Sequence, residues 1–134
     1  MNRIFVAHSD ALSDWASDVG LSKHVYKVGC IEGAADEALA EKWAGQSDWK
    51  IVAEADAGEA SEADILERLG RREKMVDPTY YPKIRGARGI FKVAPGNVQN
   101  HLIVQRALAG EEVRAEPKLK AADFAAYLLA NALR

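Results

Sequence analysis

The sequence predicts one α+β domain, in which a small, mainly antiparallel sheet of three to four strands is flanked by helices. Three observations lead to this prediction. The chain has 134 residues, which is close to the commonest size of a single domain. Short apolar runs of β type alternate with stretches of helical periodicity, and Gly, Pro, Asp or Asn separate them. The apolar fraction of 49% and the charged fraction of 28% are those of an ordinary folded protein.

The first half of the chain is expected to contain three strands and two helices. The strands are short apolar or alternating runs that end at turn residues, at 4–7, 24–28 and 49–55. The helices place apolar side chains at intervals of three and four residues, at 10–19 and 34–44. Ser9 or Asp10 can cap the first helix, and Gly20 stops it.

The second half is expected to add three helices and one short strand. A helix begins near Ser61, which forms a capping-box pattern with Asp64, and it ends in the cationic run 71–74. Two prolines, two tyrosines and two glycines between Asp77 and Gly89 predict a loop. The later elements are a strand at 89–93, a helix at 98–109 and an amphipathic closing helix at 119–133.

The expected domain organisation is simple. Residues 1–110 form the α+β domain, and residues 111–134 form a connection and a C-terminal helix. Only the polar stretch 110–117 resembles a linker. The closing helix is expected to pack on the same domain, on a second copy or on another protein.

Cysteine usage and hydropathy predict a cytoplasmic protein without a membrane partner. Cys30 is the only cysteine, so the chain cannot form an internal disulfide or a cysteine-based zinc site. No apolar run approaches the ~20 residues that span a bilayer. The three histidines lack metal-ligand spacing.

Positive charge is concentrated in one stretch of a chain whose formal net charge is -2. Residues 1–67 carry fourteen acids against five bases, whereas residues 68–92 carry eight bases against two acids. Together with Tyr80 and Tyr81, these cations can contact phosphates and stack on bases. A solvated basic face opposite the acidic first half explains the same charges. The candidate nucleic-acid contacts are Arg68, Arg71, Arg72, Lys83, Arg85 and Arg88.

The order of the predicted elements and the tetrapeptide Tyr26–Gly29 resemble the GIY-YIG endonuclease superfamily, especially its phage and bacterial branch. In that branch the second motif usually reads Tyr-Lys-Ile-Gly or Val-Lys-Ile-Gly. The first motif is matched by the strand Arg3–Val6, the acidic helix by Glu62 with its following apolar residues, and a later strand by Ile90–Val93. The resemblance covers about residues 3–109.

The resemblance implies a metal-dependent nuclease site. Tyr26 matches the second motif tyrosine, which helps to order the nucleophilic water. Glu62 matches the carboxylate that binds one divalent cation, Mg²⁺ or Mn²⁺. The set is incomplete, because Phe5 replaces the first tyrosine and lacks a hydroxyl. The phosphate-binding arginine is also missing, since Lys42 is the only cation between Gly29 and Lys50.

Two hypotheses of function follow. The first is a degenerate GIY-YIG-like domain that binds or processes nucleic acid, with nuclease activity in doubt. The second is a noncatalytic protein-interaction or dimerisation module that uses the closing helix. Purely structural roles also explain these two residues, because Tyr26 can be a packing residue of its strand, and Glu62 suits the first turn of a helix.

Overall fold

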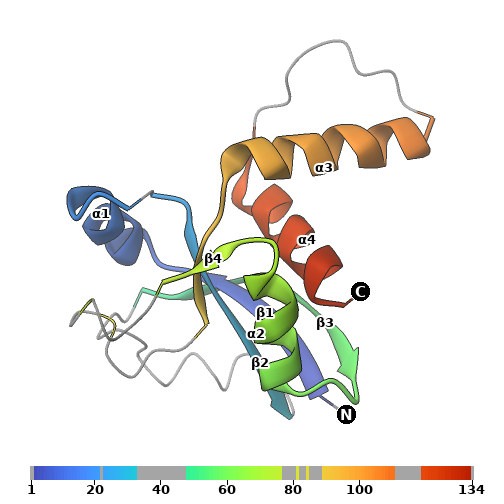
Figure 1. Cartoon of the computed structure of the whole chain (residues 1–134), viewed down its shortest axis with the longest axis horizontal. Helices are drawn as coiled ribbons and strands as arrows, with labels where there is room; N and C mark the ends of the chain where they lie inside the picture. Colours follow the sequence, from blue (N-terminus) through green and yellow to red (C-terminus); the bar gives the residue numbers. More distant parts are fainter. Residues whose placement is uncertain are drawn as a thin grey trace.

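The structure is a computed structural model of the chain, and it describes residues 2–21, 23–32, 48–76, 81, 84, 89–110 and 119–133. These residues form one mixed α+β arrangement of a twisted sheet and helices (Figure 1). The predicted helix at 34–44 lies outside the described residues.

In the part of the chain that the structure describes, the sheet has five strands in the order β3-β1-β2-β5-β4, and every neighbouring pair is antiparallel. Their bounds are β1 Asn2–His8, β2 Val25–Glu32, β3 Lys50–Gly58, β4 Lys74–Met75 and β5 Ile90–Lys92. The antiparallel α+β class is confirmed. The predicted number of strands, three to four, is too low, because β4 adds a fifth. This strand has only two residues, so it shows no alternation that a sequence pattern can reveal.

Within the described ranges, four helices accompany the sheet, and their bounds are α1 Asp10–Asp18, α2 Glu62–Gly70, α3 Pro95–Leu108 and α4 Ala121–Ala132. The capping box that Ser61 and Asp64 predict is confirmed, with each backbone N–H donating to the other side chain at 3.2 Å. Helix α3 begins three residues earlier than the prediction of 98, since Pro95 occupies the first turn, where its missing N–H costs nothing.

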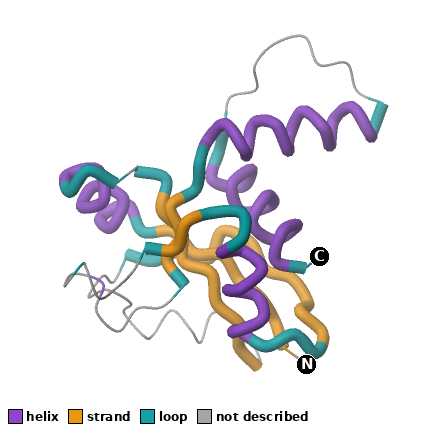
Figure 2. Tube along the Cα trace, in the orientation of Figure 1, coloured by secondary structure: helices purple, strands orange, loops and turns teal. Residues whose placement is uncertain are grey.

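Apolar side chains cover both faces of the sheet. On one face, α2 and α4 lie over β1, β2 and β3, and side chains such as Ile65, Leu69 and Leu128 are fully buried against the strands. On the other face, Leu12 and Ala16 of α1 pack with Phe5, Val25 and Ile90. Figure 2 shows α3 extending beyond the sheet and packing beside α4. The space between α2, α3 and α4 therefore lies on a single face of the sheet.

Gly89 is the tightest backbone contact between β2 and the chain that enters β5. Its carbonyl accepts a hydrogen bond from the Val28 N–H at 2.8 Å. Its φ is +83°, and a Cβ placed there would lie 2.3 Å from the Val28 carbonyl oxygen. Both features exclude any side chain without a shift of the backbone.

We expect Gly89→Ala to lower the free energy of unfolding by at least about 2 kcal/mol, because strain at positive φ adds to the overlap with backbone. Urea denaturation followed by circular dichroism measures the change. Gly96→Ala is the matched control, since no atom lies within 4 Å of its added Cβ apart from its chain neighbours and the backbone of its own helix. That control should be neutral or slightly stabilising, and equal losses in both variants would contradict the packing argument.

Candidate functional site

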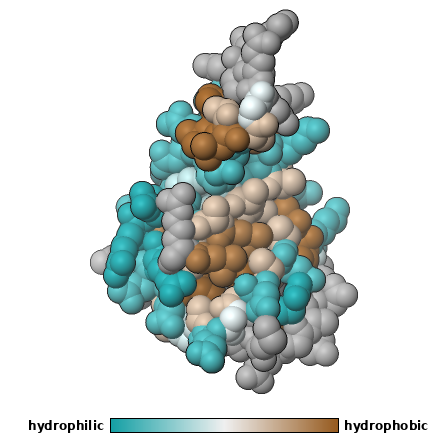
Figure 3. Space-filling view, turned by 90° about the vertical axis from the view of Figure 1, so that its right-hand side faces the viewer, coloured by the Kyte–Doolittle hydropathy of each residue, from teal (hydrophilic) through white to brown (hydrophobic). Residues whose placement is uncertain are grey.

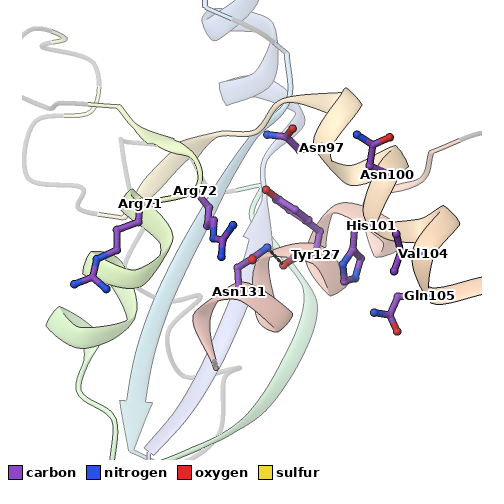
Figure 4. Close-up of a pocket in the computed structure, with 9 residues that line it drawn as sticks. All are labelled: Arg71, Arg72, Asn97, Asn100, His101, Val104, Gln105, Tyr127 and Asn131. Atoms are coloured by element: carbon purple, nitrogen blue, oxygen red, sulfur yellow. Dashed lines mark hydrogen bonds between the residues drawn. The ribbon is translucent and has the colours of Figure 1, made fainter. Parts of the chain in front are cut away.

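A cleft of about 460 Å³ opens between the C-terminal end of α2 and the helices α3 and α4. This volume lies within the range of small-molecule binding sites. Figure 4 shows side chains from the three elements converging on it. Its lining consists of Arg71, Arg72, Asn97, Asn100, His101, Val104, Gln105, Tyr127 and Asn131.

The α3 wall of the cleft is polar because of the helical spacing of its residues. Positions 97, 100, 101, 104 and 105 follow one another at intervals that bring them to one face of a helix. Three of these five carry amide side chains and one is a histidine. Amides offer both donors and acceptors, so this wall suits a ligand with several polar groups.

The two arginines follow directly from the end of α2. Arg71 is its C-terminal cap residue and pairs with Glu67 at 2.8 Å, one helical turn earlier. In Figure 4 the side chain of Arg71 turns away from the α4 residues, whereas that of Arg72 points toward Tyr127 and Asn131. Both arginines are exposed. The Arg72 guanidinium can therefore meet an anionic group inside the cleft, while Arg71 stands at its rim.

The buried carboxyl group of Glu73 links the elements that surround the cleft. Glu73 is 6% exposed, and in the sequence it stands between Arg72 and the first residue of β4. One of its oxygens accepts hydrogen bonds from the Tyr127 hydroxyl at 2.7 Å and from the Asn97 amide at 2.9 Å. The other accepts from the Ala94 N–H at 3.1 Å, at the N-terminus of α3. Three hydrogen bonds thus replace the water that burial removes.

Tyr127 and Asn131 extend this network along α4. Burial and the hydrogen bond to Glu73 raise the pKa of the Tyr127 hydroxyl, so it stays a donor at neutral pH. The Asn131 amide donates to the Tyr127 carbonyl at 2.9 Å. The His101 ring meets the Tyr127 ring edge-on, with centroids 5.6 Å apart. Helix α4 therefore presents a fixed polar surface to the cleft.

Tyr26, the candidate catalytic tyrosine, lies in the interior of the sheet and not in this cleft. It is 4% exposed, and its ring stacks on Phe124 at 5.3 Å and contacts His8 at 5.0 Å between centroids. Burial raises the pKa of Tyr26 to about 12. Lys27 and Val28 of the same tetrapeptide are buried as well.

Glu62, the candidate metal ligand, lies close to the other end of the tetrapeptide. Its Oε1 accepts a hydrogen bond from the Cys30 N–H at 3.4 Å. Phe5 is paired with Gly29 across β1 and β2, and a Cβ on Gly29 would meet both the Phe5 ring and Glu62 Oε1. The structure thus brings Phe5, Gly29 and Glu62 together. Burial and the Glu62 carboxyl raise the pKa of the Cys30 thiol, as an unreactive cysteine requires.

The candidate nucleic-acid residues divide into three groups. Arg71 and Arg72 belong to the cleft. Arg68 donates to the Ala132 carbonyl at 3.0 Å, at the C-terminal end of α4. It therefore links two helices and complements a helix terminus. Lys83, Arg85 and Arg88 lie outside the described residues.

Within the described ranges, no group of three or more His, Cys, Asp or Glu side chains is placed to hold a metal ion. The assignment of Mg²⁺ or Mn²⁺ to Glu62 stays a prediction from the resemblance.

A second polar cluster joins the end of β1 to α1. The His8 Nε2 lies 2.8 Å from the Ser13 hydroxyl, and its Nδ1 lies 3.5 Å from Asp10. These residue types also form the triads of hydrolases. Ser13, however, is 8% exposed and lies in α1, and Ser9 caps the same helix. This cluster therefore anchors the helix and offers no open nucleophile.

The sequence patterns did not reveal the cleft. The pattern around the amide residues of α3 predicts only a helix, and Glu73 stands in the sequence as an acid within a basic run. One available signal is the polar spacing of 100, 101 and 105 on the helix predicted at 98–109, with Asn97 just before it. The pairing of Glu73 with Tyr127, which is 54 residues away in sequence, has no local signal.

Comparisons with known proteins add no assignment: no protein-family model matches the chain, and neither the curated proteins nor the solved structures gave a match. Among the described residues, no helix is long and apolar enough to cross a membrane.

Tyr127→Phe should lower the free energy of unfolding by about 1–3 kcal/mol, because the buried Glu73 carboxyl loses a hydrogen-bond donor without gaining a solvent partner. Urea denaturation measures the loss. Asn100→Ala is the control in the same cleft, since Asn100 is exposed and should change stability by less than about 0.5 kcal/mol. A Tyr127→Phe variant as stable as the control would show that the Glu73 network contributes nothing.

The stability of the folded protein should also fall at alkaline pH, because the buried hydroxyl of Tyr26 keeps its proton to a higher pH than in the unfolded chain. The reference pKa of tyrosine is 10.0, and in the folded protein that of Tyr26 is raised to about 12. Between these values the unfolded chain releases a proton that the folded chain keeps, so stability decreases with rising pH by an amount on the order of 2 kcal/mol. Tyr26→Phe should reduce this dependence between pH 10 and 12, and the part that remains belongs to Tyr127, whose pKa is raised as well. Unfolding curves that depend on pH equally in both proteins would contradict the assignment.

Proposed function

We propose that this domain is a noncatalytic nucleic-acid-binding module, which holds a single-stranded segment in the cleft between α2, α3 and α4. The observation that carries the proposal is Arg72, an exposed guanidinium that points into a cleft walled by amide side chains. Guanidinium groups bind phosphate through two parallel hydrogen bonds, and Asn and Gln bind the edges of bases.

Electrostatics favours a weak and salt-sensitive interaction. The chain carries a net charge of -2, so it does not attract a polyanion from a distance. The basic charges are local, and Arg72 and Arg71 are followed by the exposed Lys74. Binding should therefore depend on contacts at the cleft and should weaken as salt screens them.

We further propose that the domain is related to the GIY-YIG nucleases and has a degenerate site. Support comes from β1 and β2, which carry the two motif matches, pair antiparallel and place Phe5 opposite Gly29. The position of Glu62 beside Gly29 and Cys30 adds to this support. Burial of Tyr26 in the sheet interior makes the tyrosine part of the packing, so the proposed function rests on binding and not on cleavage.

The test is fluorescence anisotropy with a labelled single-stranded oligonucleotide of mixed sequence at low and moderate salt. Wild type should bind, and Arg72→Ala should weaken binding about tenfold. The slope of log K against log salt concentration should also become smaller by about one, as expected for the loss of one phosphate contact. Arg3→Ala is the matched control, because it removes the same charge from a residue that pairs with Glu54 and lies outside the cleft.

Equal affinities for Arg72→Ala and Arg3→Ala, or no binding by the folded wild type at low salt, would overturn the proposal. The same oligonucleotides incubated with Mg²⁺ or Mn²⁺ report cleavage. A cleavage product that is lost in Glu62→Gln would replace the noncatalytic assignment with the nuclease one.

A further inference from the structure

A second, smaller pocket adjoins the cleft at the C-terminal ends of α2 and α4. Its volume is about 120 Å³, and it is lined by Arg68, Arg71, Arg72 and Asn131. Three of these residues also line the cleft, whereas Arg68 lines only the smaller pocket. A volume below the ~300 Å³ of the smallest ligand sites suits a single chemical group of a ligand that extends into the cleft.

Arg68 and Arg72 supply the positive charge of the small pocket. The guanidinium of Arg68 is held in place by a hydrogen bond to the Ala132 carbonyl at 3.0 Å. This bond uses one of its several N–H donors, and a neutral carbonyl does not cancel its charge. Arg72 is exposed and points toward Asn131 from the other side of the pocket (Figure 4). Two guanidinium groups and one amide therefore surround the same small space.

The acidic side chains near this pocket are engaged elsewhere. Glu67 pairs with Arg71 at 2.8 Å on the exposed surface of α2. The oxygens of Glu73 accept three hydrogen bonds from the segments of α3 and α4. Among the described residues, neither carboxyl group lines the pocket. Its chemistry is therefore that of an anion-binding site.

We infer that this pocket binds the terminal phosphate of a nucleic-acid strand, while the nucleoside that carries this phosphate occupies the adjoining cleft. The inference rests on the function proposed above. A terminal phosphate is a monoester with three unshared oxygens and a charge of about -1.5 to -2 at pH 7. A phosphate inside a strand has two such oxygens and a single charge. Because each guanidinium binds oxygens in pairs, Arg68 and Arg72 together match the monoester better.

The surroundings of the pocket favour the end of a strand over its middle. Helices α2 and α4 pack together, with Leu69 and Leu128 in one buried cluster, so a strand cannot pass between them. The outward side of α4 is apolar and includes the half-exposed Leu129 and the exposed Leu133. Figure 3 shows a continuous apolar area on the side of the molecule where α4 and β3 lie. A strand that continued over α4 would lose hydration of its phosphates without gaining donors.

The experiment is fluorescence anisotropy with one single-stranded oligonucleotide, labelled on an internal base, in three forms. These forms carry a 5′-phosphate, a 3′-phosphate or hydroxyl groups at both ends. Wild type should bind one phosphorylated form about tenfold more tightly than the hydroxyl form, because charge-assisted hydrogen bonds are added. The form that gains affinity identifies which end of the strand the pocket binds.

Arg68→Gln should bring the ratio of these affinities close to one, because glutamine can still donate to the Ala132 carbonyl but carries no charge. Circular dichroism and urea denaturation verify that this variant is folded. Arg106→Gln is the matched control, since it removes the same charge from a residue of α3 that lines neither pocket, and it should preserve the ratio. Inorganic phosphate gives a second measurement on wild type. It should lower the ratio more than chloride does at equal ionic strength.

Equal affinity of wild type for the three forms would overturn the inference, and it would leave the proposed function standing if the hydroxyl form still binds and depends on Arg72. A ratio that Arg106→Gln lowers as much as Arg68→Gln would also overturn it. The same holds for a ratio that neither Arg68→Gln nor inorganic phosphate changes. Absence of binding by all three forms would overturn the inference together with the proposed function.

Discussion

The buried carboxyl group of Glu73 is the interaction on which the arrangement of α3 and α4 depends. It follows α2 directly and accepts hydrogen bonds from both of the later helices. The N-cap residue Ala94 makes no side-chain cap to α3, and its N–H donates to the carboxyl group of Glu73, which lies 21 positions earlier. A carboxyl group is favourable there because the helix dipole is positive at that end. This one group therefore connects the segment after α2 to both helical walls of the cleft.

Helix α4, which Glu73 holds through Tyr127, lies between the cleft and the tetrapeptide Tyr26–Gly29 that carries the family resemblance. Tyr26 lies in β2, the central strand of the sheet, and packs under Phe124 of α4. Helix α4 therefore covers the tyrosine on one side and offers Tyr127 and Asn131 to the cleft on another. A central strand is the most buried place in a sheet, so a motif there is well placed to determine packing. The cleft is lined instead by residues of α3 and α4 and by the two arginines that follow α2.

The helices and strands could be predicted from the sequence better than the tertiary contacts between them. Capping at Ser61 and the positions of the longer strands were readable, because caps and periodicity are local signals. Strand β4 was missed, since two residues cannot show a period. The candidate site was found only in part, at Arg71 and Arg72. The rest depends on Glu73 contacting Asn97 and Tyr127, and contacts of such sequence separation follow from the folded topology alone.

The different sides of helix α4 have different surroundings. Tyr127 and Asn131 face the cleft, Phe124 and Leu128 face the sheet, and Ala122 and Ala126 face outward. Ala122 and Ala126 do not line the cleft, so the polar wall that α4 contributes consists of Tyr127 and Asn131. A domain with a net charge of -2 does not attract a polyanion from a distance, so the proposed binding depends on the contacts that this side of α4, the amide side chains of α3 and Arg72 offer.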